Sequence, residues 1–171
     1  GSALTLGSAL TLLGSFTLLE NVSLPLVEFT GLSEDEVEMV AMHKLDIVGL
    51  ADAAGSPPLS VSGGMQKRAA LARAMALDPE VLFFDEPSAG LDPVTSYSLD
   101  LLIRKINREM GTTMVIVTHE LASIFAISHR VVMLDADAMG IIATGTAEEL
   151  RDSSDDPRVQ RFFNPTEEEG A

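Results

Sequence analysis

Apolar residues along the chain follow two different periods, and each period marks one kind of element. After a capping box at Ser33, with Glu36 three positions later, apolar residues recur at helical spacing. This pattern predicts a helix that ends near Gly49 or Gly55. An alanine-rich run over residues 64–77 predicts a second helix, because alanine has the highest helix propensity.

A third helix has clear start and stop signals. Asp92 and Pro93 suit the N-cap and the first helical position, and Gly111 is expected to end the helix after Met110. Thr146 is expected to cap a further, short helix.

Residues 81–84 are wholly apolar, as is typical of a strand that is buried on both faces, and residues 112–118 are expected to form another buried strand. A short helix is expected over residues 120–127, and residues 130–134 and 139–143 are expected to pair as a hairpin. Strands that alternate with helices predict an α/β fold with a mainly parallel sheet.

Residues 1–19 have no charged side chain and begin with a six-residue segment that recurs letter for letter at residues 7–12. A repeat this short is not a solenoid, so no structure is predicted for it. The segment lacks the basic start of a signal peptide, and Gly, Ser and Thr interrupt it too often for a membrane-spanning helix. We therefore expect the chain to be soluble.

The 171 residues include 26 acidic and 11 basic side chains, which gives a net charge of −15. A surface this acidic repels nucleic acid, so we expect no nucleic-acid partner. Cysteine is absent, which excludes disulfides and thiolate metal sites. The acidic residues that continue to Glu169 predict a solvated, partly disordered tail over residues 151–171.

Ser62-Gly63-Gly64 stands directly before the predicted alanine-rich helix. Two glycines let the backbone approach an anion closely, and a helix start turns free N–H groups towards it. Ser62 adds a hydroxyl donor. Alone, the triplet is better explained as an ordinary turn with a serine cap.

Asp85 and Glu86 follow a predicted strand, and His119 ends the next one. A strand-end aspartate can hold Mg²⁺ through its water shell, and a neighbouring glutamate can deprotonate an attacking water. A histidine at the same sheet edge can bind a terminal phosphate. The alternatives are a solvated acidic pair and a structural histidine.

The order of these motifs resembles the ATP-binding cassette (ABC) ATPases. Residues 59–92 are similar to that family's signature helix, Walker B strand and D-loop in unbroken succession, and the resemblance extends over about residues 16–150. It implies ATP and Mg²⁺ as cofactors in a head-to-tail dimer. The implied ATP-binding residues are Ser62, Gly63, Gly64, Met65, Gln66 and Asp92; the implied Mg²⁺ ligand is Asp85, and the implied catalytic residues are Glu86 and His119.

Met65 stands where glutamine is commoner in the family's signature. With residues 20–26, 67–74 and 83–93, it resembles the ATPases of bacterial lipid-transport systems that work with MCE-domain proteins. The resemblance implies a second ATPase subunit, an integral-membrane permease and an MCE-domain substrate-binding protein as partners. It also implies a peripheral location on the cytoplasmic face of the inner membrane.

The family's Walker A loop, Gly-x-x-x-x-Gly-Lys-Ser/Thr, does not occur in these 171 residues. None of the lysines follows a glycine; they are Lys44, Lys67 and Lys105. We therefore expect the chain alone to bind ATP poorly and to hydrolyse little. Because sheet strands would also be missing, an uncovered sheet and low stability are expected.

These observations predict a P-loop NTPase-like core without its Walker A region, divided into four segments. They are a remnant of the family's Q-loop region at 1–19, a helical subdomain at 20–77, an ATPase core at 78–150 and the acidic tail. Two alternatives remain: a catalytically incomplete fragment that only dimerises or couples to a permease, and an ABC-type ATPase of DNA repair. The second lacks support, because no coiled-coil insertion is present and the charge disfavours DNA.

Overall fold

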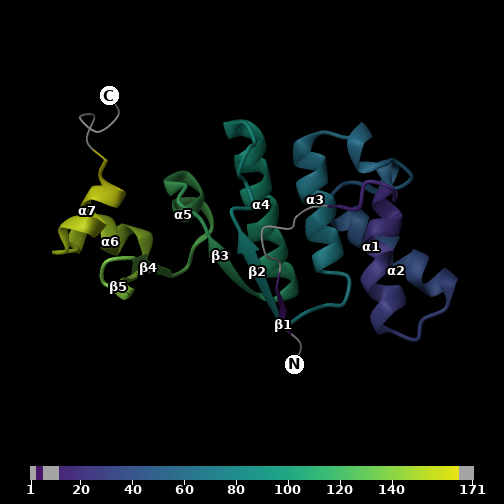
Figure 1. The fold of residues 1–171 in the computed structure, drawn as a ribbon, viewed down its shortest axis with the longest axis horizontal. Coiled ribbons are helices and arrows are strands. Elements are labelled where there is room, and N and C mark those ends of the chain that lie inside the picture. The colour runs from purple at the N-terminus through teal and green to yellow at the C-terminus, as the bar shows by residue number, and fades with distance from the viewer. Residues whose placement is uncertain (1–2, 6–11, 166–171) are drawn as a thin grey trace. The chain divides into compact units, whose positions relative to one another are not determined.

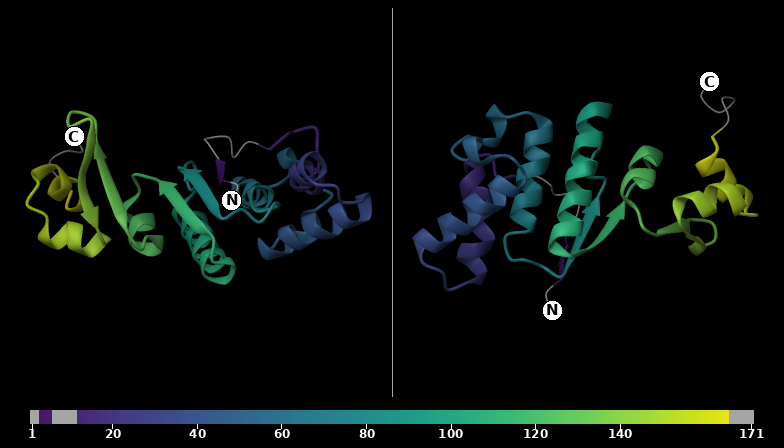
Figure 2. Two further views of the ribbon diagram at one scale, coloured as in Figure 1. Left: turned by 90° about the horizontal axis from the view of Figure 1, so that it is seen from below. Right: turned by 180° about the vertical axis from the view of Figure 1, so that it is seen from behind.

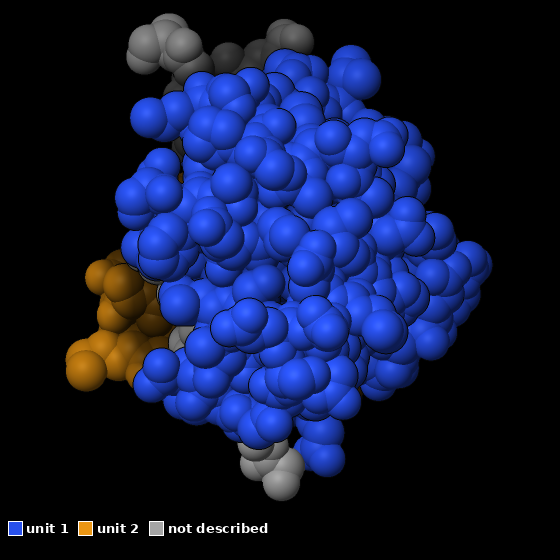
Figure 3. All heavy atoms as spheres, turned by 90° about the vertical axis from the view of Figure 1, so that its right-hand side faces the viewer, with its two compact units in different colours: residues 1–118 blue, residues 119–171 orange. Residues whose placement is uncertain are grey.

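A computed structural model describes residues 3–5 and 12–165 (Figure 1). Contacts divide the chain into two compact units, residues 1–118 and residues 119–171, which Figure 3 distinguishes by colour. Each unit is described by itself. None of the helices in the described ranges combines the length and the hydrophobicity needed to cross a membrane.

The first unit joins a group of helices to a three-stranded sheet. Its strands are β1 (Ala3–Thr5), β2 (Val81–Asp85) and β3 (Thr113–Val117); its helices are α1 (Leu18–Phe29), α2 (Glu34–Ile47), α3 (Gly63–Ala74) and α4 (Pro93–Met110), with 3-10 turns at Ala51–Ala53 and Pro58–Ser60.

The strands of this unit are parallel and lie in the order β1-β2-β3, which confirms the predicted parallel sheet. Helix α4 lies along one face of the sheet (Figures 1 and 2). Leu82 and Phe84 of the central strand are buried, and the buried side of α4 presents Leu99, Ile103 and Ile106. This apolar layer supports the strand end at which the acidic pair lies.

Strand β3 forms one edge of this sheet. Its side chains Val115 and Val117 are 42% and 60% exposed. The prediction that this strand is buried on both faces is therefore wrong. An exposed apolar edge strand can pair with a further strand, so such edges are usually covered. The exposure agrees instead with the expectation of a partly uncovered sheet, while the expected low stability stays a prediction. At the other edge, Ala3–Thr5 form a strand where no structure was predicted. Most of the repeated segment, residues 6–11, lies outside the described residues.

Helices α1, α2 and α3 pack against one another, and α3 also packs against α4. The capping box predicted at Ser33 is present. Helix α1 begins two residues before the boundary predicted for the helical subdomain, because Thr17 and Glu20 form a second capping box. The buried Asn21 then fixes the preceding turn, accepting from Leu13 N at 2.8 Å and donating to Thr17 O at 2.8 Å.

The second unit contains the predicted antiparallel hairpin, β4 (Val131–Asp135) and β5 (Gly140–Gly145), after α5 (Leu121–Ile127). It ends with α6 (Ala147–Ser153) and α7 (Pro157–Phe163). The prediction of a solvated tail is wrong for α7. Val159 and Phe163 are 0% and 4% exposed, because they share an apolar cluster with Ile124 and Leu150. Residues 166–171 of the predicted tail lie outside the described residues.

The start of α7 has an acid-sensitive cap. Both oxygens of Asp156 accept from the guanidinium of Arg158, one at 2.7 Å and the other at 3.0 Å, and these bonds lower the pKa of Asp156 from 3.8 to about 2. A lowered folded-state pKa stabilises the fold above pH 3.8, and this contribution is lost as pH falls towards 2. Asp156→Asn is therefore expected to flatten the pH dependence of Tm between about pH 4 and 2.

Thermal melts followed by circular dichroism across this range test the expectation. Asp155→Asn removes the same charge one residue earlier and is the matched control. Equal slopes for wild type and Asp156→Asn would contradict the role of the cap.

Candidate functional site

Strand β2 ends at the acidic pair predicted from the sequence. Asp85 is the last strand residue, pairs in register with Val117 and is exposed. Glu86 leaves the strand with φ of 46°, a left-handed conformation that is uncommon outside glycine and costs about 1–3 kcal/mol. Adjacent side chains point to opposite sides only along extended backbone, and Glu86 is not extended.

Strand β3 holds Glu86 in this conformation. The Glu86 N–H donates to Val117 O at 2.9 Å, and the Thr118 hydroxyl donates to Glu86 Oε2 at 3.2 Å. The carboxylate is thus held at the carboxyl ends of two parallel strands, with Asp85 beside it. Such a pair is suited to holding a hydrated cation and to orienting a water molecule.

The start of α3 lies against the start of α4. Ser62 is the N-cap of α3, and its hydroxyl accepts from Met65 N at 3.3 Å. A Cβ built on Gly63 would lie 3.6 Å from Leu91, while a Cβ on Gly64 would lie only 2.5 Å from Thr95 Cγ2. Gly64 is therefore required for close packing in this structure, beyond the access to an anion for which it was singled out.

Two further residues that were predicted to bind ATP, Met65 and Gln66, lie in the first turn of α3. The Gln66 amide donates to Pro58 O at 2.9 Å and to Val61 O at 3.3 Å, so it anchors the loop before α3. Met65 is half-buried in the first turn of that helix. Their part in nucleotide binding stays a prediction.

The loop from Ser88 to Asp92 turns back through Gly90, which has φ of 79°. Asp92 then caps α4: Oδ1 accepts from Val94 N and Thr95 N, both at 3.1 Å, and the Thr95 hydroxyl donates to Oδ2 at 2.5 Å. These bonds lower the pKa of Asp92, and the bond from the Thr95 hydroxyl has the largest effect. The cap was predicted, whereas the predicted role of Asp92 in linking two ATP sites stays a prediction.

His119 is exposed and opens the second unit, directly after Thr118. Its contact with a γ-phosphate stays a prediction. Within the described ranges, no three His, Asp or Glu side chains gather as a ready-made metal site. Mg²⁺ commonly uses one or two carboxylates together with water and phosphate oxygens, and the exposed Asp85 can supply one such oxygen.

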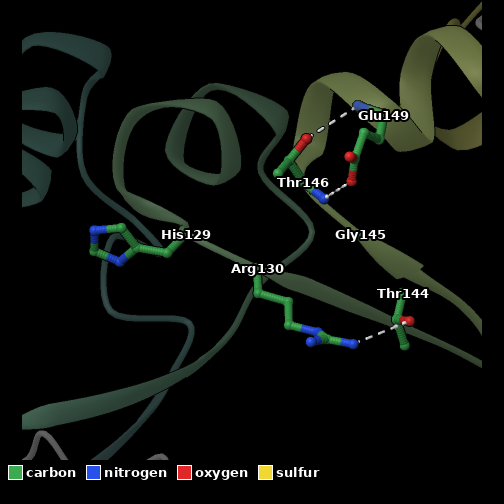
Figure 4. A pocket seen from close by; sticks show the side chains of 6 residues that line it. All are labelled: His129, Arg130, Thr144, Gly145, Thr146 and Glu149. Carbon is green, nitrogen blue, oxygen red and sulfur yellow. Dashed lines mark hydrogen bonds between the residues drawn. The ribbon is translucent and has the colours of Figure 1, made fainter.

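A shallow hollow of about 320 Å³ lies within the second unit (Figure 4). Thr146 and Glu149, which line it, form the capping box of α6, and Arg130 donates to Thr144 Oγ1 at 3.5 Å. None of the predicted site residues lines this hollow. It therefore adds nothing to the predicted chemistry.

Neither the contacts of Thr95 nor the bond from Thr118 to Glu86 was predicted from the sequence. Thr95 stands three residues after an N-cap aspartate, a position from which a hydroxyl commonly reaches the cap. No comparable local signal links Thr118 to Glu86, because the two residues are 32 positions apart.

Comparison with known proteins gives one family match, to the model described as ABC transporter, over residues 4–89. The chain is 40% identical over 148 residues to the intermembrane phospholipid transport system ATP-binding protein MlaF of Escherichia coli K12, which covers 86% of this chain and 54% of that protein. It is also 40% identical over 147 residues to the probable ribonucleotide transport ATP-binding protein mkl of Mycobacterium leprae, covering 86% and 42%.

Solved structures agree on the fold. A dimeric, post-hydrolysis ATP-binding cassette, MJ0796 bound to ADP and Pi, matches with a TM-score of 0.71 and 30% identity, covering 85% of this chain and 62% of that one. CbiO1 of Clostridium perfringens matches with a TM-score of 0.76 and 26% identity, covering 87% and 58%. The chain thus spans about half the length of the curated relatives it matches.

Proposed function

The chain belongs to the ABC transporter family, and from that premise we propose that it is the ATP-binding subunit of a transporter for phospholipid or another hydrophobic substrate. The observation that best supports the proposal is the strand end at which Thr118 and Val117 hold Glu86 beside Asp85. The relative named as a phospholipid transport protein supports the substrate class.

In the proposed reaction Glu86 accepts a proton from a water molecule. The water oxygen attacks the γ-phosphorus of ATP, and the bond to the β–γ bridging oxygen breaks, which yields ADP and phosphate. Asp85 would hold Mg²⁺, which supplies neutralisation of the phosphate charge. His119 would contact the γ-phosphate.

The remaining predicted residues act on ATP held by a second subunit. We propose that the turn at Ser62, Gly63 and Gly64 caps that ATP, with Met65 and Gln66 behind it, and that Asp92 connects the two sites. The dimeric cassette among the solved structures supports a paired arrangement. The phosphate cradle normally formed by a Walker A loop would come from residues other than these 171.

The permease is proposed to dock on the group formed by α1, α2 and α3. Helices α1 and α2 present exposed apolar side chains: Val27 and Phe29 in the last turn of α1 and Met39 in α2 are 65%, 71% and 70% exposed. Exposed apolar groups of this kind are typical of interaction surfaces. The chain would then work at the cytoplasmic face of the membrane, together with an MCE-domain protein.

Equilibrium binding of a fluorescent ATP analogue with Mg²⁺, measured on the Glu86→Gln chain to block turnover, tests the proposal. The expected result is weak binding by the chain alone and tight binding once a partner that has a Walker A loop is added. Absence of binding with the partner would favour the alternative, a fragment that only dimerises or couples to a permease. Micromolar binding by the chain alone would mean that another segment replaces the Walker A cradle.

A further inference from the structure

Gly64 is a glycine for reasons of space. Its backbone does not have the positive φ found at Gly49, Gly90 and Gly111, so alanine fits its helical conformation. A Cβ at this position would nevertheless lie 2.5 Å from Thr95 Cγ2, closer than carbon atoms approach. The first turns of α3 and α4 are therefore separated at this point only by the methyl group of Thr95.

Thr95 contacts the second motif through its other branch. Its hydroxyl donates to Asp92 Oδ2 at 2.5 Å, and its N–H donates to Asp92 Oδ1 at 3.1 Å. One side chain thus touches the Ser62–Gly64 turn with its methyl group and the end of the loop 88–92 with its hydroxyl. Thr95 is half-buried, as a residue between two packed helix starts is expected to be.

We propose that Thr95 is a positioning residue that holds the Ser62–Gly64 turn in register with Asp92. This inference rests on the proposed function, because register matters only if both motifs act on ATP. The methyl group sets the distance between the first turn of α3 and the first turn of α4. The hydroxyl holds the side chain of Asp92 in its position as the N-cap of α4. A change at Thr95 thereby reaches two sites without contact between Thr95 and the nucleotide.

The contact is tested first on the chain itself by exchanging the methyl group between the two helices. Gly64→Ala is expected to lower Tm by roughly 3–9 °C, because it overpacks a site that has no free space. The Thr95→Ser change removes the Cγ2 methyl, so in the Gly64→Ala/Thr95→Ser double variant the nearest neighbour of the new methyl is the Cβ of residue 95 at 3.9 Å, which is an ordinary contact. The double variant is therefore expected to recover the wild-type Tm.

The positioning role is tested on the transporter complex that contains the chain, by ATP hydrolysis. Thr95→Ser keeps the hydroxyl and the cap but leaves the turn unsupported, and it is expected to raise KM for ATP roughly tenfold. The turnover number kcat is expected to stay unchanged, because Thr95 is not among the residues proposed to act on the γ-phosphate. Thr95→Val keeps a methyl group but loses the hydroxyl that donates to Asp92 Oδ2, so it tests the second contact separately.

The outcomes separate the inference from the proposed function. A wild-type complex without ATP hydrolysis would remove the proposed function and the positioning role together. An active wild type with unchanged KM in Thr95→Ser would overturn the positioning role alone. A rise in KM in Thr95→Ser with kcat unchanged would support it, since a general loss of stability lowers the amount of active complex, and with it the apparent kcat, without changing KM.

Discussion

Replacing Glu86 by glutamine is expected to lower ATP hydrolysis by the assembled transporter on the order of 10²- to 10⁴-fold, the usual contribution of a general base. Glutamine has nearly the same shape but cannot accept the proton of the attacking water. Its side-chain oxygen can still accept from Thr118, so the strand end is expected to keep its geometry. Binding of ATP is therefore expected to persist while turnover is lost.

Phosphate release under saturating ATP measures this effect, and binding of a fluorescent analogue measures the retained affinity. Glu80→Gln is the matched control, because Glu80 is an exposed glutamate just before β2, at the opposite end of the same strand. Full hydrolysis by the Glu86→Gln complex would show that another group activates the water.

Leu82→Ala is expected to destabilise the chain by about 2–5 kcal/mol. Leu82 is 0% exposed in β2, the strand between β1 and β3, so the lost methyl groups leave a cavity. A domain of ordinary stability has only about 5–15 kcal/mol in total. A single truncation at this position is thus expected to remove a large share of it.

Urea unfolding followed by circular dichroism measures the change. Leu134→Ala is the matched control: Leu134 also lies in a strand but is 71% exposed, and its truncation is expected to cost about 0.5 kcal/mol or less. Equal losses for both variants would mean that the apolar layer of the sheet contributes little to stability.

Helix α4 was predictable from end to end because its signals are local. Asp92 caps it, Pro93 is its first residue, and Gly111 ends it with φ of 67°. The second predicted helix shows the limit of this approach. We predicted residues 64–77, but α3 ends at Ala74, and the chain reverses through Asp78, which has φ of 46°. Helix propensity is a property of single residues, so it does not show where the chain must leave a helix to enter a sheet.

The acidic tail shows the same limit. Its composition favours solvent, yet Val159 and Phe163 of α7 pack with Ile124 and Leu150. The charged residues of such a short helix lie on its exposed face, whereas its two buried apolar residues determine where the helix packs. Their partners lie in other elements, so no count of charges along the tail reveals the contact.

The sequence by itself determined the helix caps, the parallel α/β class and the family, because each depends on neighbouring residues or on motif order. Only the tertiary structure decided how the site is held. The left-handed turn at Glu86 depends on Val117 of the adjacent strand and on Thr118 directly after it, and the space at Gly64 depends on Thr95 of another helix. Both depend on residues some 30 positions apart, whose approach follows from packing of the whole unit and not from local preference.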